Sequence, residues 1–272
     1  MLASFLITLR EGVEAFLLVG IALAYLNKLN AKHYHKYIYI GAFVGLLLSL
    51  IVAVAFQVLI DQFSHALYRH YLMAGVLIFA TIVLTYMAIW MQGQAKAQVA
   101  KMQDDLSLMV STQNLWGLIF LATLAVLREG FETILFFSAL MYANAGELNA
   151  QGTMIGAISG LVCAALLVWA ILKSTRNVPL QSFFRWTSLL IIIIAAGLLS
   201  SAINMLQAAD MIPIIQAQVF DISSILDDRS VFGTFLRALF GYNSSPSLLQ
   251  LLTWGAYMST FIFFWNKGYK KA

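Results

Sequence analysis

Seven apolar stretches dominate the 272-residue sequence, each about as long as the roughly 20 residues that an α-helix needs to cross a bilayer. Composition agrees, because 61% of the residues are apolar and 10% are charged, against about 45–50% and about 25% in soluble domains. The sequence therefore predicts an all-α integral membrane protein and excludes a soluble enzyme, a disordered chain and a nucleic-acid-binding protein. The expected transmembrane helices are Leu2–Leu26, Ile38–Ile60, Tyr71–Met91, Leu115–Tyr142, Met154–Leu172, Trp186–Leu206 and Leu248–Trp265.

The distribution of lysine and arginine predicts the orientation of the chain. Eleven of these residues fall in the loops after the first, third and fifth expected helices and in the tail. Three fall on the other side, namely Arg69, Arg229 and Arg237. Since basic loops stay in the cytoplasm, we expect a cytoplasmic C-terminus and, with seven spans, an N-terminus outside. The expected location is the cytoplasmic (inner) membrane, with lipid around a multi-pass chain.

An internal repeat divides the sequence into two similar halves. The segment Leu6–Glu14 matches Leu124–Glu132, 118 positions later, and a Gly-xxx-Gly pair follows each copy, at Gly41 and at Gly156. Because three helices separate the copies, the second copy enters the membrane from the opposite side, as in many secondary transporters. We therefore expect one transporter unit over 1–272, with repeat one at 1–91, repeat two at 115–207, an external segment of short amphipathic helices at 208–247, and an unmatched seventh helix at 248–266.

Each copy carries an Arg-Glu-Gly-x-Glu motif close to the middle of its apolar stretch. A charged side chain at the bilayer centre costs about 2.5–3.5 kcal/mol on insertion scales, so the charges must face the interior of the bundle and pair with one another. At 100° per residue, the arginine and both glutamates of each motif share one side of their helix. The first motif comprises Arg10, Glu11 and Glu14, and the second comprises Arg128, Glu129 and Glu132.

Two such faces meeting across a pseudo-twofold axis would bring four carboxylates and two guanidinium groups together. Carboxylate oxygens suit a hard or borderline cation and do not suit Cu(I). Each arginine can orient a carboxylate through paired hydrogen bonds and lowers the charge of the site to a net −2. The alternative is a pair of buried salt bridges that only lock the helices together, which explains less well why the motif occurs twice with a second glutamate in each copy.

Arg-Glu-x-x-Glu in the first and fourth of seven spans resembles the signature of the fungal high-affinity iron permeases and their bacterial EfeU-type relatives. The resemblance extends to Leu239–Tyr242 and to Pro246-Ser247 before the seventh span. It implies uptake of iron, with Glu11, Glu14, Glu129 and Glu132 as the iron-binding residues. It also implies an extracytoplasmic partner that delivers or oxidises iron, which is a multicopper ferroxidase in fungi and a periplasmic iron-handling protein in bacteria.

The predicted function is therefore an iron permease with a midplane site, in which Arg10 and Arg128 position the carboxylates. Asp227 and Asp228 in the external segment are candidates for capturing the ion at the entry. A net charge of −2 favours Fe²⁺ and leaves Fe³⁺ open. We expect no bound cofactor and no enzyme, because the sequence has no catalytic or cofactor motif. The alternative is a proton-coupled carrier of an organic anion or of another divalent metal, using the same carboxylates.

Overall fold

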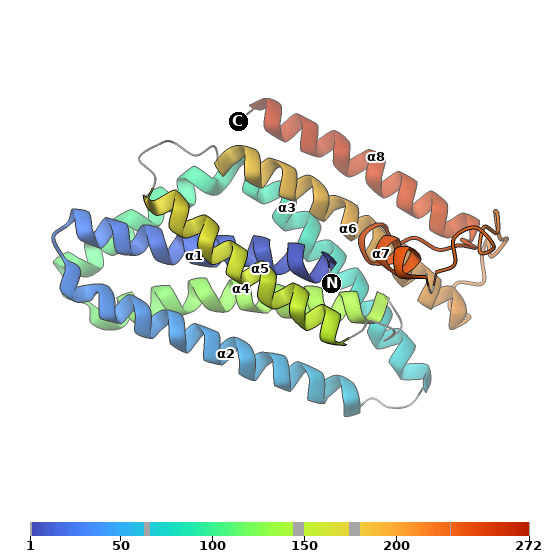
Figure 1. Ribbon diagram of the computed structural model, residues 1–272, viewed down its shortest axis with the longest axis horizontal. Helices are drawn as coiled ribbons and strands as arrows, with labels where there is room; N and C mark the ends of the chain where they lie inside the picture. The colour runs from blue at the N-terminus through green and yellow to red at the C-terminus, as the bar shows by residue number, and fades with distance from the viewer. Residues whose placement is uncertain (1, 63–65, 144–149, 174–179, 229, 272) are drawn as a thin grey trace.

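The computed structural model describes residues 2–62, 66–143, 150–173, 180–228 and 230–271, and the described chain is an elongated bundle of helices (Figure 1). Arg229, which the orientation argument counts on the outer side, lies outside these residues. The helices are α1 (Leu2–Lys28), the 3₁₀ turn η1 (Lys32–Tyr34), α2 (His35–Gln62), α3 (Ala66–Ser111), α4 (Leu115–Ala143), α5 (Ala150–Lys173), α6 (Leu180–Ala208), α7 (Val231–Phe240) and α8 (Leu248–Lys271).

Among the described residues, five helical segments are long and apolar enough to cross a membrane, so the chain is a multi-pass membrane protein. These segments are Lys32–Leu59, His70–Trp90, Gln151–Lys173, Arg185–Ala208 and Leu248–Lys267. Helices α1 and α4 have comparable lengths of 27 and 29 residues, but each carries an arginine and two glutamates within its apolar sequence. Helices α1 and α4, which carry the two motifs, are therefore not among the five segments identified by length and apolar composition.

Helix α3 is longer than the sequence predicts. It was expected to end near Met91, yet it continues as one 46-residue helix to Ser111. The extension lacks proline, and its apolar residues recur at helical spacing, so that Met102 and Leu106 are buried. They pack against side chains at the ends of the neighbouring helices, including Leu26, Tyr34 and Leu118. The expected loop after the third span is thus a helix that covers one end of α1, α2 and α4.

Several helix contacts of α1–α3 correspond to those of α4–α6. If α1, α2 and α3 are exchanged with α4, α5 and α6, each of the following four contact pairs becomes another of the four or itself. Helix α1 lies along α5, and α2 lies along α4, while α3 packs against α6 and α1 packs against α4. Helix α8 packs on α6 and α3 at one edge of the bundle, and α2 forms the opposite edge (Figure 1). This pairing places the two motif helices in contact inside the bundle.

Two glycines allow close helix crossings at matching positions. A Cβ at Gly160 of α5 would clash with the backbone of α1, and a Cβ at Gly45 of α2 would clash with the backbone of α4. The atoms met are Phe5 O and Leu9 N in the first case, and Thr123 O and Leu127 N in the second. Phe5 and Thr123 stand at the same place relative to their motifs, as do Leu9 and Leu127. The α1·α5 and α2·α4 crossings therefore share one register.

The motif glycines lie at the same two crossings. A Cβ on Gly12 would lie 2.9 Å from the Cβ of Ala164, and a Cβ on Gly130 would meet the side chain of Ser49. The helix wheel of each motif places its glycine opposite the charged residues, where a neighbouring helix can approach. Each motif thus presents its charges on one side and its small residue to the partner helix on the other.

In the segment 208–247, which was expected to form several short helices, the described residues after α6 contain one helix. Helix α7 begins after Ser230, whose hydroxyl accepts a hydrogen bond from the N–H of Gly233, and ends at Gly241 with a φ of 67°. Residues 211–228 are irregular, so the prediction of short helices is wrong there. Pro213 and a series of β-branched residues disfavour a helix in this stretch. Gly241 packs directly on Gly197 of α6, which holds α7 against the bundle.

Candidate metal site between α1 and α4

The first motif is a buried ion-pair network. The Arg10 guanidinium donates a hydrogen bond from Nη1 to Glu11 Oε1 at 2.5 Å, and its Nη2 lies 2.9 Å from Glu14 Oε1. All three side chains are at most 4% exposed. Nη1 also lies 3.5 Å from the sulfur of Met87 on α3. Arg10 therefore holds both glutamates of its own motif inside the bundle.

The second motif has the same sequence but looser geometry. Arg128 donates from Nη2 and Nε to Glu129 Oε1 at 2.7 and 2.9 Å, whereas Glu132 Oε1 is 3.7 Å from Nε. The Arg128 side chain is 41% exposed, and its guanidinium lies over the ring of Trp90, 5.9 Å from the ring centroid. Glu129 is buried, but Glu132 retains 13% exposure. The second motif therefore holds one glutamate tightly and the other loosely.

Carboxylates from both motifs converge. One oxygen each from Glu11, Glu14 and Glu129 lies within 4.8 Å of the others, and Glu132 is not part of this group of three. In the described part of the chain, the second oxygens of Glu11, Glu129 and Glu132 are buried and accept no hydrogen bond. A buried acceptor without a partner costs about 1–3 kcal/mol. The cluster therefore offers carboxylate oxygens that make no hydrogen bond and could coordinate a hard or borderline cation.

A small cavity lies beside the first motif, between α1, α3, α4 and α6. Arg10 and Glu11 line it together with apolar side chains such as Leu84, Phe136 and Ile194. Such surroundings have a low dielectric, in which charge–charge interactions are stronger than in water. An ion held by these carboxylates would interact with them strongly.

The family comparison covers nearly all of the chain that holds this site. The model of the Iron permease FTR1 family matches residues 1–266. The chain belongs to the iron permease FTR1 family. The family resemblance predicted from the two motifs is thereby confirmed, and the chain is a member of a family of membrane permeases for iron uptake, which is a transporter family and not an enzyme family.

Curated relatives of this permease have similar lengths. The chain is 32% identical over 261 residues to the ferrous iron permease EfeU of Yersinia pestis, which covers 95% of this chain and 90% of the relative. It is 30% identical over 261 residues to the ferrous iron permease EfeU of Escherichia coli O6:K15:H31. This alignment covers 95% of the chain and 92% of the relative. No solved structure matches the permease.

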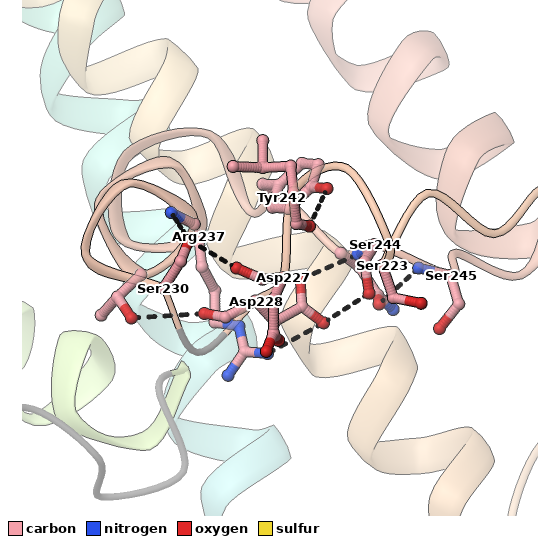
Figure 2. A network of polar contacts seen from close by, with 12 residues as sticks. Ser223, Asp227, Asp228, Ser230, Arg237, Tyr242, Ser244 and Ser245 are labelled. Carbon is pink, nitrogen blue, oxygen red and sulfur yellow. Dashed lines mark hydrogen bonds and ion pairs between the residues drawn. The ribbon is translucent and has the colours of Figure 1, made fainter.

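Asp228, one of the two predicted capture residues of the permease, has a structural role. Its carboxylate accepts hydrogen bonds from the backbone N–H and the hydroxyl of Ser244, at 2.8 and 3.0 Å, and pairs with Arg237 of α7 at 3.1 Å (Figure 2). In the same loop, the hydroxyl of Tyr242 donates to Leu226 O. Asp228 therefore fastens the loop before α8 to α7. A role in ion capture for Asp228 stays a prediction.

Asp227 and Asp221 lie in the same irregular segment and are exposed. The carbonyl oxygen of Asp227 accepts a hydrogen bond from the Ser230 hydroxyl. At Asp221, hydrogen bonds from Ser223 hold the pKa of the carboxyl below its usual range, so this group stays ionised at lower pH than an ordinary aspartate. The two exposed carboxylates keep the segment acidic, and capture by Asp227 stays a prediction.

The contribution of α3 to the site was not predicted from the sequence. Met87 contacts Arg10, and Trp90 contacts Arg128. A tryptophan at the end of an apolar stretch is ordinarily an interfacial residue, and a methionine inside one ordinarily fills a packing gap. Their spacing of three residues, which places both on one face of a helix, was the available signal.

Proposed function

We propose that the chain imports iron from outside the cell into the cytoplasm through one site made by the two motifs. The observation that carries the proposal is the approach of Glu11, Glu14 and Glu129 to within 4.8 Å in a buried position between α1 and α4. Each motif arginine pairs with the glutamates of its own helix, so these ion pairs do not lock α1 to α4. In addition, Glu11, Glu129 and Glu132 each keep an oxygen that accepts no hydrogen bond from any residue described.

The four motif glutamates, Glu11, Glu14, Glu129 and Glu132, are the proposed ligands of the transported ion. Arg10 and Arg128 orient them and reduce the charge of the empty site to a net −2. A divalent ion neutralises that charge, which favours Fe²⁺ as the substrate, and the curated relatives are named as ferrous iron permeases. Transport of Fe³⁺ would need a hydroxide or a fifth anionic ligand in addition.

The proposed architecture has seven transmembrane helices, with the N-terminus outside and the C-terminus in the cytoplasm. Repeat one (1–91) and repeat two (115–207) form inverted halves, which the shared register of the α1·α5 and α2·α4 crossings supports. The segment 208–247 faces the outside, and 248–266 is the added helix. The site then lies near the bilayer midplane, and rocking of the halves exposes it to each side in turn.

In the membrane of a bacterial cell, the proposed permease resides in the inner membrane and receives iron from an extracytoplasmic delivery protein or ferroxidase. The acidic outer segment, including Asp227 and Asp228, attracts the cation to the entry. These proposals rest on the family and on the charge of the loop.

The test measures ⁵⁵Fe²⁺ flux into proteoliposomes made with the full chain. We expect Glu→Gln at each of the four motif positions to lower the flux at least about tenfold, because even outer contacts of a metal site contribute that much to affinity. The matched control is Asp104→Asn, which changes an exposed carboxylate on α3 and should transport normally.

Three results would contradict the proposal. If iron flux survives in all four glutamine variants, the motif glutamates are not required for transport. Inhibition of iron flux by an organic anion, together with uptake of that anion, would favour the proton-coupled carrier in its place. Preferential competition by Mn²⁺ or Zn²⁺ would indicate another divalent metal as the substrate.

A further inference from the structure

Helix α3 contacts the arginines of both motifs. Met87 and Trp90 are three residues apart and therefore lie on one face of the helix. The sulfur of Met87 is 3.5 Å from Arg10 Nη1, and the ring of Trp90 lies under the Arg128 guanidinium at 5.9 Å. One face of α3 thus meets one guanidinium with a thioether and the other with an indole.

The two contacts attract a guanidinium to different degrees. The face of an indole is the best cation–π partner among the side chains, whereas a thioether is a weak hydrogen-bond acceptor. Arg10 remains on its glutamates and lies 2.9 Å from Glu14. Arg128 keeps Glu129 but lies 3.7 Å from Glu132. Glu14 and Glu132 stand at the same place in their motifs, and the longer distance is found in the motif whose arginine lies over Trp90.

This difference leaves Glu132 as the accessible carboxylate of the site. Its side chain is 13% exposed, against 2–4% for the other three motif glutamates, and its second oxygen accepts no hydrogen bond from the described residues. Glu11, Glu14 and Glu129 form the buried group of three. Of the four motif glutamates, Glu132 therefore has the most exposed side chain.

We propose that Trp90 is a positioning residue, which holds Arg128 away from Glu132 so that this carboxylate can accept the arriving divalent cation and pass it to Glu11, Glu14 and Glu129. The inference rests on the proposed function and deepens it, because it gives the four glutamates two different tasks. Without the indole, Arg128 is free to close on Glu132 as Arg10 does on Glu14. The ion must then displace a salt bridge before it binds.

The experiment measures equilibrium binding of ⁵⁵Fe²⁺ to the purified full chain in detergent without oxygen, together with flux in proteoliposomes. Trp90→Leu removes the aromatic ring but keeps an apolar side chain that suits a helix. We expect its Kd and KM for Fe²⁺ to rise about fivefold, the factor that corresponds to a cation–π contact of about 1 kcal/mol. The maximal flux should stay unchanged, because the three buried ligands are intact.

Two further variants separate positioning from general damage. Trp90→Phe keeps a weaker ring face, so its Kd should lie between those of wild type and Trp90→Leu. Trp169→Leu is the matched control, because Trp169 of α5 also lies under a cation, Lys173 at 4.8 Å. This control should bind iron as wild type does. If Trp90→Leu does not fold, as judged by gel filtration, the shift of Trp90→Phe decides the test.

The decisive comparison repeats Trp90→Leu in a Glu132→Gln background. If Trp90 acts by keeping Arg128 away from Glu132, Trp90→Leu should cause no further loss of iron affinity in a protein that already carries Glu132→Gln. An unchanged Kd in Trp90→Leu, or the same fivefold loss in both backgrounds, would overturn the inference. Glu129→Gln separates this failure from failure of the proposed function, since a Glu129→Gln protein that binds iron normally would refute the site itself.

Discussion

The two motifs have the same sequence pattern and the same helix crossings, yet their arginines lie in different surroundings. Arg10 is buried and touches both of its glutamates, whereas Arg128 is 41% exposed and shares its charge between Glu129 and the ring of Trp90. The local sequence therefore sets which residues share a helix face, while a third helix sets how each arginine is used.

This difference divides the site into a closed part and an open part. Around the first motif, the ion pairs are buried, so removal of one partner would leave an uncompensated charge inside the protein. Around the second motif, the side chains of Arg128 and Glu132 keep exposed surface. A carrier that binds an ion from water needs one such accessible side, and the contrast can be tested at three points.

The largest effect is expected from removing the two arginines one at a time. Arg10→Ala leaves Glu11 and Glu14 as buried charges without a cation, which costs about 3–5 kcal/mol of folding stability. Arg128→Ala removes a guanidinium that is 41% exposed and leaves one buried carboxylate, that of Glu129, without its cation, so it should cost less than Arg10→Ala. Unfolding by denaturant in detergent micelles measures both. Equal losses would contradict the difference in burial.

The crossings should respond alike in the two halves. Ala at Gly160 or at Gly45 would force a Cβ into the backbone of α1 or α4, and we expect each to lower stability by about 1–3 kcal/mol. Gly75→Ala is the control, since nothing lies within 4 Å of a Cβ there, and it should be neutral or stabilise α3 by up to about 1 kcal/mol. A loss in only one of the two crossings would break the equivalence of the halves.

The smallest effect is a difference in reactivity. In a Cys163→Ser background, a cysteine at position 132 should react with a charged thiol reagent on the order of tenfold faster than a cysteine at position 14, because reagents reach exposed thiols first. Labelling rates in detergent, followed by mass spectrometry, give the ratio. A faster reaction at position 14 would place the open side at the first motif.

The helices and the meeting of the motifs could be predicted from the sequence because one rule governs both. Charges inside an apolar stretch must be satisfied within the protein, so Arg10 and Glu129 were expected in the interior, on facing helices, and α1 and α4 do pack together. The asymmetry between the arginines could not be predicted. It depends on whether Met87 or Trp90 of a distant helix lies against each one, and periodicity within α1 or α4 contains no such information.

The ends of the elements were harder to predict for a different reason. The stretch after Met91 contains charged and polar residues, which resemble a loop, yet Met102 and Leu106 find buried partners and keep α3 helical. The segment before α7 is apolar enough to suggest helices, but Pro213 and the contacts of Asp228 favour an irregular path. Tertiary contacts decide both cases.

The hydroxyl of Tyr257 on α8 lies 2.5 Å from the hydroxyl of Thr85 on α3, two residues before the methionine that touches Arg10. This contact ties α8, the helix outside the proposed repeat, to α3, whose next turn contacts Arg10. In the proposed rocking of the two halves, α8 would therefore favour one of the two tilts, and the resting protein would load from one preferred side.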